Sequence, residues 1–233
     1  MQNKVSKEIF HTANGGTYLA HHGIMGMHWG VRNGPPYPIT SKAHAETIYN
    51  NAKRHIKQIQ SDVSSAIRSS GGRAYGLEHK LKTKQSIRRK IETDSAEKNI
   101  TEAQAAKDIK DAVRFTAMYS DKNFANGYNA FKQSLIAKGY SESRCKNYFD
   151  LFRKGQAKHK SVQSVFSAPD GYKFEVQFHT RSSQDAKDKK LPLYEEARAK
   201  GVTKTRLRQL EKEMERLGNS VKDPPGVFTI ASH

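Results

Sequence analysis

The sequence has little that would place it in an oxidising compartment or in a membrane. Its single cysteine, Cys145, excludes an internal disulfide. No apolar run approaches the roughly 20 residues that a membrane-spanning helix needs. Residues 1–10 also lack the apolar core of a signal peptide. We therefore expect a soluble, cytoplasmic protein without a membrane partner.

Acidic and apolar residues are scarce as well. Lys and Arg number 41 against 23 Asp and Glu, which gives a net charge of +18. A surplus of this size attracts phosphate-bearing partners such as nucleotides, RNA or DNA, without distinguishing among them. Apolar residues make up only 35% of the chain, so we expect one modest core surrounded by solvated segments.

The composition changes near residue 41 and predicts four regions. Residues 1–40 are rich in Gly and His and end in Pro35-Pro36-Tyr37-Pro38, which predicts an irregular N-terminal segment. Apolar residues spaced three and four apart predict a long amphipathic helix over residues 41–72. A domain over residues 75–200 and a C-terminal helix with a tail over residues 201–233 follow.

Periodicity within these regions predicts an alternation of helices and strands. Helices are expected near residues 84–98, 101–109, 123–138, 183–199 and 205–217, and strands near residues 112–119, 148–152, 161–167 and 172–180. Pro169-Asp170-Gly171 is typical of a turn and predicts a hairpin. The expected fold class is α+β: a mixed sheet of about five strands flanked by helices, preceded by a long N-terminal helix and an irregular segment.

The most informative stretch for function is the predicted strand over residues 172–180. Alternation places Glu175, Gln177 and His179 on one face, opposite Phe174 and Phe178. A carboxylate, an amide and an imidazole in a row form a platform for a polar ligand. A solvent-exposed face of an antiparallel sheet would alternate in the same way.

Two further stretches carry residues suited to phosphates and a metal. Cations and a serine gather where the helix over residues 84–98 should begin: Lys80, Lys82, Ser86 and Lys90. The backbone N–H groups of a helix N-terminus and nearby lysines attract a triphosphate, although a solvated basic helix would show the same pattern. Asp111 begins a predicted strand that contains Arg114, and a carboxylate there could share Mg²⁺ with Glu175.

In this order the three stretches resemble the synthetase domain of the RelA/SpoT family. The spacing of Lys80-x-Lys82, Ser86-Ile87 and Lys90 is similar to a family motif, with Lys in place of the first Arg. Glu175-Val-Gln-Phe-His-Thr180, followed by Leu193-Tyr-Glu-Glu196, resembles the compact toxin-like versions of the family.

The resemblance implies an ATP-dependent pyrophosphokinase that transfers pyrophosphate to the 3′-hydroxyl of a nucleotide or an RNA, with Mg²⁺ as cofactor. It implies a catalytic role for Glu175, Asp111 and Gln177, with Asp111 and Glu175 as the metal ligands. It implies nucleotide binding by a larger set: Lys80, Lys82, Ser86, Lys90, Arg114, His159, Lys160, Gln163 and His179.

Three departures from the family pattern bear on the acceptor and on the phosphates. His159 and Gln163 stand where the family has Tyr and His in the acceptor loop, which weakens the case for a guanine nucleotide as acceptor. His179 stands where the family has Arg, so a permanent cation near the phosphates is absent.

The N-terminal stretch Tyr18–Arg32 is similar to a His-Gly-Ile-x-Gly-Met-x-Trp-Gly-Val-Arg segment that begins many bacteriophage and prophage proteins. A segment that precedes unrelated domains implies docking to a phage or host protein, and hence a phage-encoded toxin or effector in a bacterial cytoplasm or a virion. A metal site of His21, His22 and His28 is the weaker interpretation, because no cysteine accompanies them.

Two other functions are compatible with parts of the sequence. A non-catalytic phage structural or packaging protein that binds nucleic acid through a basic surface would explain the charge, but not the ordered Glu175, Gln177 and His179 face. ADP-ribosyl transfer commonly uses a Glu-x-Glu pair, whereas Glu195 and Glu196 are adjacent and face different ways.

Overall fold

The computed structural model describes residues 7–11, 17–21, 40–199 and 201–233. The chain divides into two compact units, residues 1–40 and residues 41–233. In the first unit, β1 (Lys7–His11) and β2 (Thr17–His21) pair as antiparallel strands, which the sequence did not predict. The predicted phage-type motif from residue 22 onward lies outside the described residues.

The second unit is built on a five-stranded sheet with the order β3-β4-β7-β6-β5. The strands are β3 (Arg73–Tyr75), β4 (Arg114–Met118), β5 (Ser141–Asn147), β6 (Val162–Ser167) and β7 (Lys173–His179). β4 and β7 run parallel, whereas the other neighbours are antiparallel. The predicted mixed sheet and α+β class are therefore confirmed.

Seven α-helices accompany this sheet in the described part of the second unit. They are α1 (Ser41–Ser69), α2 (Lys84–Lys98), α3 (Glu102–Lys107), α4 (Phe124–Ile136), α5 (Tyr148–Arg153), α6 (Arg181–Ala197) and α7 (Lys204–Asn219). Single 3₁₀ turns occur at Leu77–His79, Asp121–Asn123 and Val227–Thr229. Within the described ranges, none of the helices has the length and apolar character needed to cross a membrane.

Helix boundaries follow from local chemistry. The predicted long helix is confirmed as α1, and Gly71 after it has a φ of 75°, a left-handed conformation that glycine adopts without strain. The predicted capping box at Thr101 and Gln104 opens α3. Thr180 caps α6 through its side chain, so that α6 begins immediately where β7 ends.

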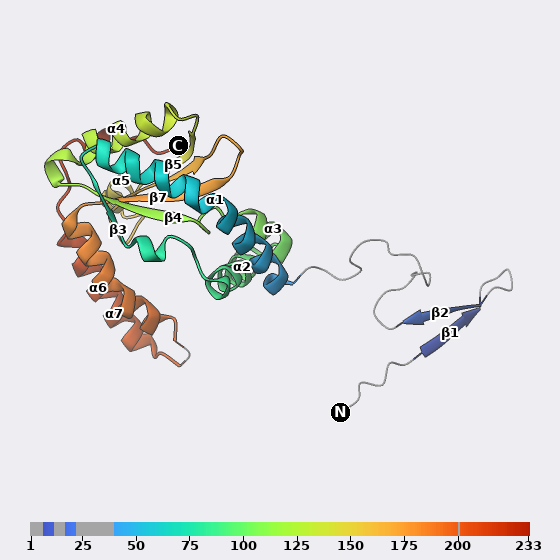
Figure 1. Cartoon of the computed structure of the whole chain (residues 1–233). Helices are drawn as coiled ribbons and strands as arrows, with labels where there is room; N and C mark the ends of the chain where they lie inside the picture. Colours follow the sequence, from blue (N-terminus) through green and yellow to red (C-terminus); the bar gives the residue numbers. More distant parts are fainter. Residues whose placement is uncertain (1–6, 12–16, 22–39, 200) are drawn as a thin grey trace. The chain divides into compact units, whose positions relative to one another are not determined.

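The core lies between one face of the sheet and the helices α1 and α4, which cover that face in Figure 1. Phe174, Val176 and Phe178 of β7 are fully buried, as the alternation predicted. The rings of Phe131 on α4 and Phe178 meet edge to face, with 5.1 Å between centroids. Helices α6 and α7 lie away from α1 and α4 (Figure 1). The polar side chains of β7 lie on the face of the sheet opposite the core.

The predicted strand over residues 148–152 is wrong, because these residues form α5. The side-chain oxygen of Asn147 accepts from the backbone N–H groups of Phe149 and Asp150 and so starts a helix there. The strand lies just before it, as β5, at the edge of the sheet. Its outer edge pairs with the C-terminal backbone, because Cys145 and His233 exchange two hydrogen bonds of 3.0 Å.

Replacement of Phe178 by Ala should lower the free energy of unfolding by about 3–5 kcal/mol, because it leaves a cavity in a packed aromatic cluster. Urea denaturation of the purified variant measures this loss. Glu175→Gln, on the opposite face of the same strand, is the matched control and should unfold close to the wild-type midpoint. A stable Phe178→Ala beside an unfolded Glu175→Gln would contradict the assignment of the two faces.

Candidate active site

The polar face of β7 is buried and not open to solvent. Glu175, Gln177 and His179 are only 7%, 5% and 1% exposed. An ordinary solvent-facing side of a sheet would leave such residues exposed. Polar groups that are buried together need partners from elsewhere in the fold, and these partners define the candidate site.

The register of the sheet places cations on both sides of Glu175. In the parallel pairing of β4 with β7, Arg114 lies opposite Glu175. In the antiparallel pairings, Val165 lies opposite Glu175, and Arg144 of β5 lies opposite Val165. Adjacent strands are about 4.8 Å apart, so Arg114, Glu175 and Arg144 belong to one row across the sheet.

A chain of two hydrogen bonds orients the carboxylate of Glu175. The ammonium group of Lys187 on α6 donates to Oε1 of Gln177 at 2.7 Å, and Nε2 of Gln177 donates to Oε1 of Glu175 at 2.7 Å. Because an ammonium group can only donate, the oxygen of the Gln177 amide must face Lys187 and its NH₂ must face Glu175. Lys187 therefore sets the orientation of Gln177 and, through it, of Glu175.

Asp111 lies in a second cluster with two of the predicted phosphate-binding lysines. Lys82 donates to its carboxylate, and Nζ of Lys90 lies 3.2 Å from both carboxylate oxygens. Burial alone would raise the pKa of Asp111, but the charges of Lys82 and Lys90 outweigh burial and lower it. Burial lowers the pKa of Lys82, and the charges of Lys90 and Arg114 act in the same direction. Asp111 is thus an anion held by two cations.

The extended segment before α2 joins this cluster to β4. The N–H of Lys82 donates to the carbonyl of Ala112, and the N–H of Arg114 donates to the carbonyl of Lys80. Thr83 caps α2 by accepting from the N–H of Ser86. The structure therefore places Lys82 just before α2, Ser86 in its first turn and Lys90 in its second, with Lys82 and Lys90 on Asp111.

No described contact joins Asp111 to Glu175. Asp111 precedes Arg114 by three residues, whereas Glu175 lies opposite Arg114, so the two carboxylates lie at different levels of the sheet. Among the described residues, no group of three or more acidic, His or Cys side chains could hold a metal. Mg²⁺ is commonly held by one or two carboxylates together with substrate phosphates, so either carboxylate could contribute one ligand to a Mg²⁺ ion that arrives with a nucleotide.

A cavity of about 490 Å³ lies between the sheet and the α6–α7 hairpin. Four of the predicted nucleotide-binding residues line it: His159, Lys160, Gln163 and His179. Its remaining wall is largely apolar and comes from α6 and α7: Ala186, Leu191, Tyr194, Ala197, Leu207 and Met214. A cavity of this size with apolar walls and a few polar groups is typical of sites for small organic ligands.

The two histidines of the cavity are held in the neutral form. Burial, assisted by the charges of Lys190 and Lys187, lowers the pKa of His159 to about 4. The ring of His159 lies against that of Tyr148, with 4.3 Å between centroids. Burial also lowers the pKa of His179 well below its usual value, and its Nε2 is buried with no hydrogen-bond partner in the described structure. Two uncharged imidazoles therefore line a mainly apolar wall.

Lys160 and Gln163, two of the predicted nucleotide-binding residues, already have hydrogen-bond partners within the protein. Nζ of Lys160 donates to the carbonyl of Val221 at 2.8 Å and pairs with Asp223 at 2.8 Å. The amide of Gln163 donates to Ser161 at 3.3 Å. Lys160 thus borders the cavity with its charge already neutralised.

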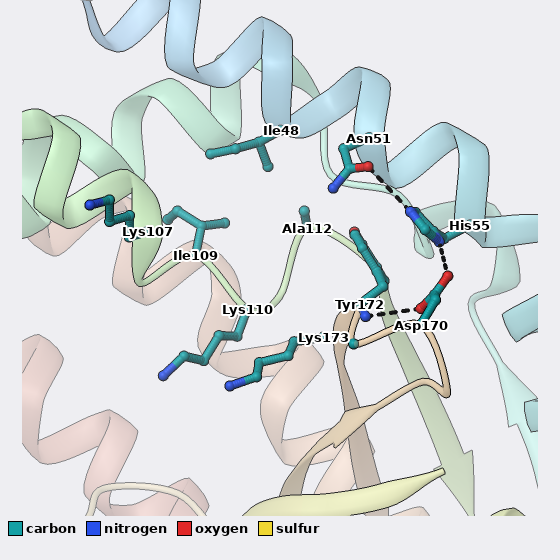
Figure 2. A pocket seen from close by; sticks show the side chains of 11 residues that line it. Ile48, Asn51, His55, Lys107, Ile109, Lys110, Ala112, Asp170, Tyr172 and Lys173 are labelled. Atoms are coloured by element: carbon teal, nitrogen blue, oxygen red, sulfur yellow. Dashed lines mark hydrogen bonds and ion pairs between the residues drawn. The ribbon is translucent and has the colours of Figure 1, made fainter. Parts of the chain in front are cut away.

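A second cavity of about 460 Å³ lies between α1, the loop before β4 and the β6–β7 turn. Figure 2 shows His55 between Asn51 and Asp170, with Lys110 and Lys173 side by side below. Nδ1 of His55 lies 2.9 Å from a carboxylate oxygen of Asp170, and its ring stacks on Tyr172 at 4.3 Å. None of the predicted site residues lines this cavity.

Sequence reasoning missed the residues that complete the site. Arg144 and Tyr148 were missed because β5 and α5 were not recognised. Lys187 and Lys190 were missed although a signal was present: Ser183, Lys187 and Lys190 are spaced four and three apart after the cap of α6, which places them on one helix face.

Comparisons with known proteins give the following likenesses. A family model described as "Family of unknown function (DUF7211)" matches residues 15–36. No curated protein has a matching sequence.

Solved structures resemble the fold at low sequence identity. The Type VI effector Tas1, solved with its immunity protein, is 14% identical; the match covers 75% of this chain and 94% of that chain, with a TM-score of 0.47. The small alarmone synthetase 1 from Bacillus subtilis, bound to its product pppGpp, is 14% identical over 74% of this chain and 88% of that chain, with a TM-score of 0.46. The small alarmone synthetase 2 from Bacillus subtilis is 15% identical over the same shares, with a TM-score of 0.47. Because these TM-scores lie below 0.5, we infer function from the side chains of the site.

The low pKa of His159 predicts a stability that depends on pH. A folded-state pKa below the unfolded value favours folding at pH values above about 6.5, and this contribution is lost as the pH falls toward 4. The wild type should therefore lose more unfolding free energy between pH 6.5 and 4 than His159→Gln, as measured by urea denaturation at each pH. NMR titration should show the ring of His159 neutral at pH 6. Protonation of the ring near pH 6.5 would contradict its burial.

Proposed function

We propose that this domain is an ATP-dependent pyrophosphokinase that transfers pyrophosphate to the 3′-hydroxyl of a nucleotide or of an RNA. The observation that carries the proposal is the burial of Glu175, held by Gln177, in a row with Arg114 and Arg144. The lysines around Asp111 are connected to this carboxylate through β4, and the cavity under α6 and α7 is connected to it through Lys187 and Gln177. Such an arrangement suits a reaction that joins a polyphosphate donor to an organic acceptor.

The donor would bind around the first turn of α2. Lys80 and Lys82 precede that turn, Ser86 lies in it, Lys90 follows it, and the backbone of Arg114 is bonded to that of Lys80. Backbone N–H groups at a helix N-terminus and charge-assisted hydrogen bonds from lysine both favour phosphate oxygens. The +18 net charge of the chain adds a general attraction for the polyanion.

Binding of ATP would change the partners of Asp111. Lys82 and Lys90 now neutralise its carboxylate, and they would turn toward the phosphates. Asp111 and Glu175 would then hold Mg²⁺, which supplies positive charge to the β- and γ-phosphate oxygens.

The acceptor would lie in the cavity, with its base against His159 and the apolar wall of α6 and α7. Glu175 would take the proton of the 3′-hydroxyl. The hydroxyl oxygen then forms a bond to the β-phosphorus, the bond from that phosphorus to the bridging oxygen of the α-phosphate breaks, and AMP leaves. Catalysis of this kind depends on positioning and on neutralising charge, and both are supplied by the cations around Glu175.

The nucleic-acid-binding structural protein remains the rival function. Its support is the large excess of exposed lysine and arginine. A protein that binds through a diffuse basic surface has no need for a buried carboxylate, amide and imidazole in one row. We therefore place catalysis first.

Glu175→Gln should abolish transfer of labelled pyrophosphate from γ-labelled ATP to a panel of nucleotides and RNA. The substitution removes the base and one proposed Mg²⁺ ligand but keeps the shape of the side chain. The unfolding midpoint should therefore change little, and ATP should still bind through the lysines around α2. Binding of RNA should be equal in both proteins, because one buried residue contributes nothing to a basic surface. Label transfer by the variant at the wild-type rate would refute this mechanism, and the absence of transfer by the wild type would favour the rival.

We further propose that residues 1–40 dock a phage or host protein and take no part in catalysis. The separation of the two units at residue 41 and the family match to residues 15–36 support this division. Deletion of residues 1–38 should leave the rate of label transfer within about twofold of the full chain. A loss as severe as that of Glu175→Gln would show that the segment completes the active site.

A further inference from the structure

Four lysines line the cavity under α6 and α7: Lys158, Lys160, Lys187 and Lys190. The first two form ion pairs with Glu211 and Asp223, and the amine of Lys190 donates to a backbone carbonyl. Lys187 differs from these three, because its amine has only the neutral amide oxygen of Gln177 as a partner. No acid lies within ion-pair distance of Lys187 among the described residues.

A partly buried ammonium group whose one hydrogen-bond partner is neutral is poorly satisfied. It carries three N–H donors, and the removal of its charge from water is costly. Burial, together with the charge of Arg114, lowers the pKa of Lys187 to about 8 against the opposing charges of Asp188 and Glu175, so the group is still mainly cationic at neutral pH. An anion that reached it would form a charge-assisted hydrogen bond and compensate for the lost water.

Lys187 also lies next to the position where the strand lacks the arginine of the family pattern. His179 is neutral and occupies the position at which the family that the sequence resembles has Arg. The charge of Lys187 contributes to the low pKa of His179, so the two side chains are neighbours. Lys187, on α6, therefore supplies the positive charge that His179, on β7, does not carry.

The position of Lys187 defines which part of an acceptor would meet it. Its amine is linked to Glu175 through the single side chain of Gln177, and it borders the cavity whose apolar wall would hold a base. A nucleotide with its 3′-hydroxyl at Glu175 and its base in the cavity has one anionic group left to place, its 5′-phosphate.

We propose that Lys187 binds the 5′-phosphate of the acceptor, so that the site selects a nucleotide, or the terminal nucleotide of an RNA, over a nucleoside. This inference rests on the proposed pyrophosphokinase function and specifies its acceptor. Lys187 would have a second role as a positioning residue for Gln177. The two roles predict different kinetics, because loss of positioning slows all acceptors equally, whereas loss of a phosphate contact affects only those with a phosphate.

The test compares three acceptors that share one base: a nucleoside, its 5′-monophosphate and a short RNA with a free 3′-hydroxyl. In Lys187→Met, the KM for phosphate-bearing acceptors should rise about 10- to 100-fold, the effect expected for one charge-assisted hydrogen bond. The KM for the nucleoside should stay within about threefold, and Lys187→Arg should restore most of the preference. An effect confined to the RNA, or to the mononucleotide, identifies which of the two supplies the phosphate.

Lys189→Met is the matched control, because it removes a cation from the same helix that is exposed and does not line the cavity. It should change the preference for a phosphate by less than about threefold. If Lys187→Met unfolds, Lys187→Gln and Lys187→Arg provide the same comparison. An equal loss for nucleoside and nucleotide, carried by kcat, would overturn phosphate recognition by Lys187.

Equilibrium binding separates this inference from the function on which it rests. Calorimetric titration without ATP should show that the wild type binds the 5′-monophosphate at least about tenfold more tightly than the nucleoside, and that Lys187→Met does not. If no acceptor is labelled but this difference is observed, the transferase function fails and phosphate recognition stands. Equal binding of nucleoside and nucleotide by the wild type would overturn the inference, whether or not label is transferred.

Discussion

The parallel pairing of β4 with β7 is the constraint on which the candidate site depends. It places Arg114 opposite Glu175 and brings two distant parts of the chain to the same carboxylate. The backbone of β4 also binds the segment that contains Lys80 and Lys82, whereas the end of β7 leads directly into α6. A shift of this pairing by one residue would turn Glu175 toward the aromatic core and Phe174 toward the ligand. The register that buries the aromatic side chains in the core is therefore the same register that places Glu175 opposite Arg114.

Charge is balanced unevenly across the site. Asp111 is neutralised by two lysines, and most lysines of the α6–α7 cavity have an acid or a carbonyl as partner. Around Glu175, in contrast, the described structure gives Arg114 and Lys187 no acidic partner within ion-pair distance. Positive charge that is partly buried and has no acidic partner is unfavourable in the free protein and becomes favourable when a phosphate arrives. Under the proposed function, part of the stability of the free protein is thus exchanged for affinity toward anions.

How much of this could be predicted from the sequence varies with the kind of signal. The hairpin of β6 and β7 was predictable because alternating aromatic residues flank Pro169-Asp170-Gly171, and α3 because Thr101 and Gln104 form a capping box. β5 was not predictable, since Ser141–Asn147 is polar and its place at the sheet edge is decided by pairing with β6 and the C-terminal backbone. Lys187 illustrates a second limit. Its helical spacing was readable, but its role depends on Gln177, a contact that only the packing of α6 against β7 creates.

The exposed apolar residues of the α6–α7 hairpin fit the same interpretation. Leu210 is buried, but Leu191, Tyr194 and Leu207 are 58%, 44% and 36% exposed and border the cavity. Apolar side chains that gather at the rim of a cavity are typical of ligand sites. A base that filled the cavity would cover these side chains. Because Lys187 lies on α6 and donates to Gln177, contacts of the base with α6 would act on the same helix that positions Gln177 and Glu175 for the proposed transfer.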